Sequence, residues 1–241
     1  MSLRLLREYI SRALTEKAVS PEIAVKEGLA LHSFKGPRSM RLILYSPADL
    51  IKGVKDTEEE FDGELSPIIT NIGANSPSTD GHIYAYFVAS KYGDGEAYNA
   101  WEVINASAIK GYGPMMYDIV MSLVGTIMSD RNSVSAMAKK VWSYYKNNRL
   151  DVKALPLDDQ NDPKTPPTID DAPLHSKNPE DPLNFAFKSD SSKIDVGALE
   201  ARHNDLAAHL STKLKISKGM VIDAIENSGE EFFRTKYHPN G

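Results

Sequence analysis

The residues best suited to chemistry lie in the turn 108–114, where Gly111 and Gly113 precede Pro114. Proline is favoured at the start of a helix, since its missing N–H removes no helical hydrogen bond. We therefore expect a helix to begin here, with free N–H groups and a partial positive charge that can bind a phosphate. The glycines would let such a ligand approach the backbone. The same pattern is also common in turns that serve only packing.

The elements around this turn follow from hydrophobic spacing. Residues 97–106 are rich in aromatic and β-branched side chains and contain no Pro or Gly, which predicts a strand. After the turn, apolar side chains at three- and four-residue spacing predict a helix. They are Met116, Ile119, Val120, Leu123 and Ile127. A break at 129–133, with Asn132 or Ser133 as N-cap, then leads into a second helix to about residue 147.

This arrangement resembles a known enzyme superfamily. The segment 83–149, above all residues 109–118, Asp130-Arg131, Ser135, Ala138 and Tyr144-Tyr145, is similar to the GNAT acetyltransferases, especially the divergent members carried by bacteriophages. The resemblance implies an α/β (α+β) fold in which helices flank a mixed, mainly antiparallel sheet. It also implies acetyl-CoA as the cofactor.

In that family the turn after the fourth strand reads Arg/Gln-x-x-Gly-x-Gly/Ala, and its amides hold the pyrophosphate of acetyl-CoA. Gly111 and Gly113 match the two small positions, whereas Ala108 stands where Arg or Gln is usual. By resemblance, the residues expected at the cofactor are Asn105, Ala106, Ile109, Lys110, Gly111, Tyr112, Gly113, Pro114, Met115 and Ser135.

The family's next motif is a helix with Asn, then Ala three residues on, then a proton-donating Tyr seven residues on. Ser135 and Ala138 fit the first two places, while Trp142 occupies the third. Trp has no proton to give in acid–base chemistry. The candidates for proton handling are therefore Tyr145, Tyr144 and Glu102. No residue stands out as the general base.

Composition limits the remaining classes of function. The chain of 241 residues is 41% hydrophobic and 25% charged, which is typical of a soluble globular protein. It has no cysteine, so disulfides and thiolate chemistry are excluded. No apolar run is long enough to span a membrane and the N-terminus lacks a signal-peptide core, so we expect a cytoplasmic or virion-associated protein. The net charge of −5 argues against non-specific nucleic-acid binding.

The other elements are predicted from the same kinds of signal. Helices are expected over 3–15, 21–31, 194–214 and 220–227; strands over 40–45, 82–89 and, at the sheet edge, 183–187; loops over 56–64 and 71–81; and a hairpin turn over 92–96. The acidic run 56–64 is expected to be a solvated loop. His203 and His209 are expected at or near the surface, because their spacing does not put two ligands on one helical face.

Proline divides the chain. Half of its 14 prolines lie in 156–182, a segment that predicts an extended arm anchored by Leu155, Leu157 and Leu174. The predicted domains are a core over 1–150, the arm over 151–182, and an edge strand with a helical appendage over 183–241. The acidic residues of the arm and His175 are too irregularly spaced to predict a metal site.

Two functions remain open. The first is an N-acetyltransferase in which an amine, on a small molecule or a protein, attacks the thioester directly while the strand backbone at 105–107 polarises the carbonyl. The second is a catalytically inactive GNAT-like module with a structural or interaction role. Ala108 and Trp142 favour the second; Gly111 and Gly113 favour the first.

Overall fold

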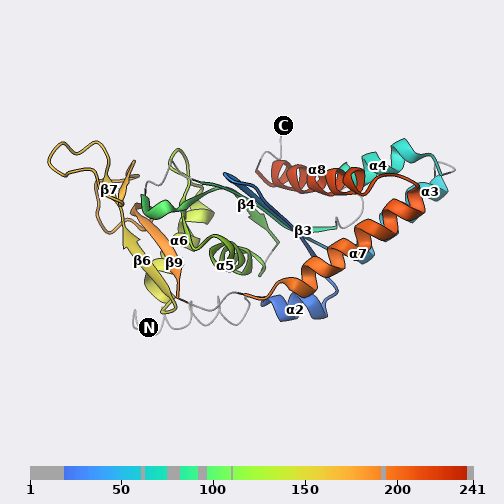
Figure 1. Cartoon of the computed structure of the whole chain (residues 1–241), viewed down its shortest axis with the longest axis horizontal. Helices are drawn as coiled ribbons and strands as arrows, with labels where there is room; N and C mark the ends of the chain where they lie inside the picture. The colour runs from blue at the N-terminus through green and yellow to red at the C-terminus, as the bar shows by residue number, and fades with distance from the viewer. Residues whose placement is uncertain are drawn as a thin grey trace.

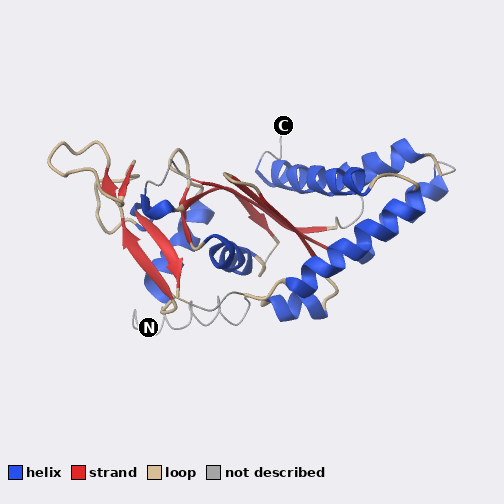
Figure 2. Ribbon diagram, in the orientation of Figure 1, coloured by secondary structure: helices blue, strands red, loops and turns tan. Residues whose placement is uncertain are grey.

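The computed structural model describes residues 19–60, 63–74, 82–91, 97–109, 111–190 and 194–237. The helix expected over 3–15, the hairpin turn at 92–96 and Lys110 lie outside these residues. A seven-stranded sheet runs through the described chain in the order β1-β2-β3-β4-β5-β9-β6, with helices on both faces (Figures 1 and 2). The predicted class, a mixed and mainly antiparallel sheet flanked by helices, is confirmed.

The strands of this sheet are β1 (Ala30–Lys35), β2 (Ser39–Tyr45), β3 (Ile83–Lys91), β4 (Trp101–Ala108), β5 (Thr126–Ser129), β6 (Val152–Pro156) and β9 (Phe185–Ser189). The α-helices are α2 (Pro21–Lys26), α3 (Pro47–Glu60), α4 (Leu65–Ala74), α5 (Gly113–Val124), α6 (Ala136–Asn148), α7 (Gly197–Leu214) and α8 (Lys218–Tyr237). Short elements complete the described chain: η1 (Ala97–Asn99), η2 (Pro182–Asn184), and a small two-stranded sheet of β7 (Asp158–Asp159) and β8 (Asp171–Ala172).

One pair of neighbours in the main sheet is parallel. β4 and β5 pair over three positions, from Trp101 with Ile127 to Val103 with Ser129. On its other side β4 carries a bulge against β3, because Val103 pairs with Ala89 and Asn105 with Val88, which leaves Ile104 as the extra residue. Beyond Val103, β4 continues to Ala108 while β5 has ended. The two strands therefore form a fork.

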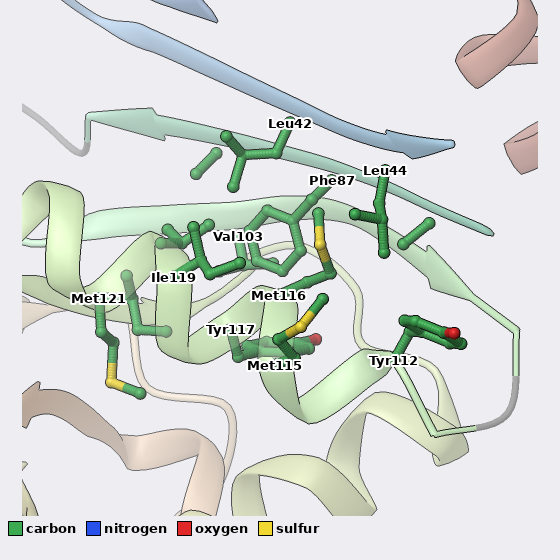
Figure 3. Close-up of a cluster of buried hydrophobic side chains, with 14 of the residues drawn as sticks. Leu42, Leu44, Phe87, Val103, Tyr112, Met115, Met116, Tyr117, Ile119 and Met121 are labelled. Atoms are coloured by element: carbon green, nitrogen blue, oxygen red, sulfur yellow. The ribbon is translucent and has the colours of Figure 1, made fainter. Parts of the chain in front are cut away.

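Apolar side chains cover both faces of the sheet, as its alternating strands require. On one face Leu42, Leu44, Phe87 and Val103 point toward α5 and pack with its buried side chains (Figure 3). These are Met115, Met116, Tyr117, Ile119 and Met121. On the other face Ile43, Tyr45 and Tyr86 pack with α7 and α8, through Leu206, Leu210, Val221 and Ile225. The sheet is thus the middle layer of three (Figure 1).

Two predicted helices are too long. The helix expected over 21–31 ends at Lys26, since Gly28 takes a φ of 81° and the chain turns into β1. The predicted helical residue Ile127 lies in β5, because α5 ends at Gly125, whose φ of 90° is unfavourable for other residues. β5 was missed because it has four residues and its Ile127 fits helical spacing.

Other predicted boundaries also change. The acidic run expected as a loop is helical as far as Glu60, since Val54 and Thr57 are buried on one side of α3. The loop expected from residue 71 is helical to Ala74. α8 is longer than predicted, and the cap of α6 is Ser135, whose Oγ accepts the Ala138 amide (3.2 Å).

The expected edge strand is interior. β9 lies between β5 and β6, and β6, from the arm, forms the edge. That order suits Pro156, which has no N–H to donate to a further strand. The arm's three predicted anchors pack as expected: Leu157 is buried, and Leu155 and Leu174 are partly buried, in a cluster that includes Met128 and Ala186.

His203 is buried rather than near the surface, and it joins three elements of the fold. Its Nδ1 lies 2.9 Å from the Tyr45 hydroxyl and its Nε2 lies 3.2 Å from His32 Nδ1. His32 Nε2 lies 2.9 Å from a carboxylate oxygen of Glu226 on α8. Burial lowers the pKa of His203 to about 4, and that of His82 likewise to about 4. Both rings are therefore neutral in the folded protein near pH 6.

We expect Gly125→Ala to lower the free energy of unfolding by about 1–2 kcal/mol, because its φ of 90° is strained for a residue with a Cβ. No atom lies within 4 Å of that added Cβ, so the cost comes from the backbone alone. Gly53→Ala in α3 is the matched control: its Cβ also meets nothing within 4 Å, and stability should be unchanged or rise by up to about 1 kcal/mol. Urea denaturation measures both free energies of unfolding. Equal effects of the two substitutions would contradict the positive φ assigned to Gly125.

We expect stability to fall as pH decreases from 6.5 toward 4. The two histidines take up protons in the unfolded state near pH 6.5 but in the folded state only near pH 4. Each contributes a slope of about 1.4 kcal/mol per pH unit within that window. His203→Gln should therefore show a shallower decline than the wild type in denaturant titrations from pH 7 to 4. Parallel curves would show that His203 does not titrate this way.

Candidate functional site

A pocket of about 230 Å³ lies at the fork between β4 and β5. It is lined by four consecutive residues of β4, by the segment after β5, and by the helices on either face. The lining residues are Val103, Ile104, Asn105, Ala106, Tyr117, Asp130, Ser133, Val134, Ser135, Ala138, Trp142 and Phe233. Consecutive strand residues point to opposite faces, so this pocket follows the edge of β4 rather than one face of the sheet.

Side chains from both layers of helices meet in the pocket. Tyr117 of α5 and Trp142 of α6 belong to the core on one face, and their rings contact edge to face with centroids 5.2 Å apart. Phe233 of α8 belongs to the core on the other face. The pocket therefore reaches through the sheet where β4 and β5 separate.

The glycine turn lies next along the chain, between β4 and α5. Gly111 has a φ of 100°, a conformation that favours glycine. The helical bonding begins with the Met116 amide, which donates to the Tyr112 carbonyl (3.2 Å), and the Tyr112 amide donates to the Ile109 carbonyl (3.2 Å). Within the described residues, the amides of Gly113 and Met115 have no acceptor. A Cβ built on Gly113 meets nothing within 4 Å, so the start of α5 faces open space.

Tyr112 holds this turn against α2. Its hydroxyl donates to the Glu27 carboxylate, and its ring packs edge to face on Tyr84 with centroids 5.3 Å apart. Burial, followed by the Glu27 contact, raises the pKa of Tyr112. The Gly111 carbonyl accepts the Val19 amide (3.1 Å). These contacts fix where the free amides of α5 lie.

Nine of the ten expected cofactor residues are described by the structure, and they fall into two groups. Asn105, Ala106 and Ser135 line the pocket. The second group surrounds the start of α5: Ile109, Gly111, Tyr112, Gly113, Pro114 and Met115. In this group Tyr112 and Met115 are buried and pack with the sheet, so they contribute backbone rather than side chain (Figure 3). Lys110 is outside the described residues.

The three residues expected to handle protons do not line the pocket. Tyr145 is fully buried, and its hydroxyl donates to Asp118 Oδ1 (2.7 Å) and the Pro114 carbonyl (3.2 Å). Burial and then Asp118 raise its pKa well above the usual value. Tyr144 is partly exposed beside it, and burial raises its pKa too. Glu102 accepts the Arg131 amide.

Tyr117, Asp130 and Phe233 also line the pocket, and the sequence assigned no chemical role to any of them. Tyr117 belongs to the apolar stripe of α5, which concealed it among core residues. Asp130 directly follows β5, the strand that hydrophobic spacing missed. Phe233 lies about a hundred residues after Asp130 in the sequence, and no local pattern connects it to β4. Had β5 been predicted, Asp130 would have been expected at the end of a strand next to β4.

In comparisons with known proteins, no protein-family model, no curated protein and no solved structure matches the chain. None of the helices in the described residues is both long and apolar enough to cross a membrane. In the same residues, no three His, Asp or Glu side chains are grouped so as to hold a metal ion. Function is therefore argued from the pocket and its surroundings.

We expect Tyr145→Phe to lower the free energy of unfolding by about 1–3 kcal/mol, because it leaves two partly buried acceptors, the Pro114 carbonyl and Asp118, short of a donor. Tyr144→Phe is the matched control next to it: no described residue bonds its hydroxyl, so stability should stay within about 0.5 kcal/mol. Chemical denaturation distinguishes them. An unchanged free energy of unfolding for Tyr145→Phe would show that the hydrogen bonds of this hydroxyl do not stabilise the fold.

Proposed function

We propose that this protein is an acyl-CoA-dependent N-acyltransferase that transfers an acetyl group to an amine. The observation that carries the proposal is the pocket at the fork of β4 and β5, together with the free amides at the start of α5, the next element along the chain after β4. In the described chain the glycine turn follows the fourth strand, as it does in the GNAT family. The mixed, mainly antiparallel sheet is also the one that the resemblance implies.

The start of α5 supplies backbone contacts for such a cofactor. The Gly113 and Met115 amides, at the positive end of the α5 dipole, suit a pyrophosphate. Beyond Val103, β4 has β3 on one side and no described strand on the other, so an extended pantetheine arm would lie along the β4 residues that line the pocket.

The reaction needs the acyl carbonyl to lie near Asn105. The amine nitrogen forms a bond to the carbonyl carbon, the carbon–sulfur bond breaks, and the thiolate of CoA leaves. Oriented amides stabilise the negative charge on the carbonyl oxygen, an effect that contributes several kcal/mol in acyl transfer. Within the described residues, no hydrogen-bond partner is recorded for the Asn105 side chain, which lines the pocket and is available to a ligand.

The two residues that depart from the family pattern, Trp142 and Ala108, have a packing role. Trp142 is 1% exposed, stacks on Phe187 with ring centroids 5.3 Å apart, and forms an apolar wall of the pocket. Ala108 packs against the core beside α5. Neither residue fills the fork, because the pocket remains open beside them.

Isothermal titration with acetyl-CoA tests the proposal. We expect micromolar binding that Gly113→Trp abolishes, because the indole would occupy the open space over the free amides. The space around Gly113 also means that this variant should fold normally, which circular dichroism checks. Gly53→Trp in α3, equally open, is the control and should bind like the wild type. No binding at millimolar acetyl-CoA would leave only the inactive, structural alternative.

A further inference from the structure

The lining of the pocket contains one carboxylate within the described residues, that of Asp130. Its Oδ1 accepts the amides of Asn132 (2.6 Å) and Ser133 (3.2 Å), which fixes the side chain in a turn. No described residue is recorded as a partner of its second oxygen. Asp130 therefore presents a positioned negative charge, with one oxygen available to a ligand.

This carboxylate lies at the vertex of the fork, the point where the pairing of β4 with β5 ends. Asp130 directly follows Ser129, the last residue of β5, which pairs with Val103. The next residues of β4, Ile104 to Ala106, line the same pocket. The charge thus lies at the point of the sheet where β5 ends and the pocket begins, which is where the proposed thioester would lie.

Apolar side chains form one wall of the opening. Phe233 of α8 lines the pocket from the other face and lies near Tyr86, with ring centroids 6.1 Å apart. Ile104, which also lines the pocket, is 44% exposed at the bulge. A ligand that reaches Asp130 past these two side chains would contact apolar surface on this side.

Two carboxylates of α8 near Phe233 are bound by arginines. Glu230, one helical turn before Phe233, lies 3.5 Å from Arg41 Nη2 and 3.7 Å from Arg234 Nη2. Glu226 binds Arg41 Nη1 and also His32. Among the described residues Asp130 is the one carboxylate that lines the pocket, which suits a ligand with a single ammonium group.

From these contacts we propose that Asp130 binds the ammonium group of the acceptor, and that the acceptor is a primary monoamine with an apolar or aromatic body that packs on Phe233. The inference rests on the proposed acyl transfer and specifies its second substrate. It assigns the base that the sequence did not reveal to a residue at the end of β5.

The proton balance of the step is simple. The ammonium gives one proton to solvent and the resulting amine remains hydrogen-bonded to Asp130. As the nitrogen bonds to the carbonyl carbon, its surplus proton passes to the Asp130 carboxylate, and the electron pair of the broken carbon–sulfur bond leaves with the thiolate of CoA. Asp130 then returns the proton to solvent or to the thiolate.

The test is Asp130→Asn, assayed with acetyl-CoA and either 2-phenylethylamine or spermidine by release of the CoA thiol. Asparagine keeps the Oδ1 that accepts the two turn amides and removes only the charge. We expect KM for 2-phenylethylamine to rise by about tenfold or more, the scale of a lost hydrogen bond to a charged group. The Kd for acetyl-CoA should be unchanged. The wild type should prefer 2-phenylethylamine to spermidine.

Asp162→Asn is the matched control, because Asp162 Oδ1 also accepts a turn amide, that of Lys164 (2.9 Å), on the exposed arm outside the pocket. It should behave as the wild type. The inference is overturned if acetyl-CoA binds but Asp130→Asn leaves the amine KM unchanged, if spermidine is the better acceptor, or if 2-phenylethylamine is not acetylated. Absence of acetyl-CoA binding would instead overturn the proposed function.

Discussion

The separation of β4 from β5 is the constraint on which the rest of this structure depends. The two strands pair over three positions, and then β5 ends at Ser129 while β4 continues to Ala108. Beyond Val103, β4 therefore has a paired neighbour in the described sheet only on the side of β3. The pocket lies where β5 has ended, and Asp130, the residue after β5, lines it.

The two layers of helices respond to this fork differently. α5 begins at Gly113, shortly after β4 ends at Ala108, so its free amides follow that strand directly along the chain. α8 approaches the opposite face so closely that a Cβ on Gly229 would lie 2.6 Å from the Tyr86 ring. That close approach brings Phe233, one turn later, into the pocket. One layer therefore offers polar backbone groups, and the other an aromatic wall.

Local signals in the sequence predicted what is local in the structure. The strand over 40–45 and the glycine turn before α5 follow from alternation and from Gly and Pro placement, which act within a few residues. Helical spacing placed Tyr145 on the same side of α6 as Trp142, but spacing does not say whether that side meets a pocket or the core. Asp118 and Arg149 bind near Tyr145 and hold it in the interior. Phe233 lines the pocket only because of how α8 packs on the sheet, and no short sequence pattern encodes that packing.

For the proposed acyl transfer, the position of Asp130 in the pocket, which neither Tyr144 nor Tyr145 lines, has a chemical rationale. A thiol has a pKa of about 8.5, so a thiolate is a stable leaving group near neutral pH and gains little from a proton donor. In the proposed reaction the acceptor, an alkylamine, resembles lysine, with a pKa of about 10.4, and would reach the pocket as an ammonium that cannot attack until it loses a proton. The harder problem is thus on the side of the amine. The Asp130 carboxylate would hold the nitrogen in place and accept the proton that the nitrogen loses as it attacks, so a tryptophan at position 142 removes little that the proposed reaction requires.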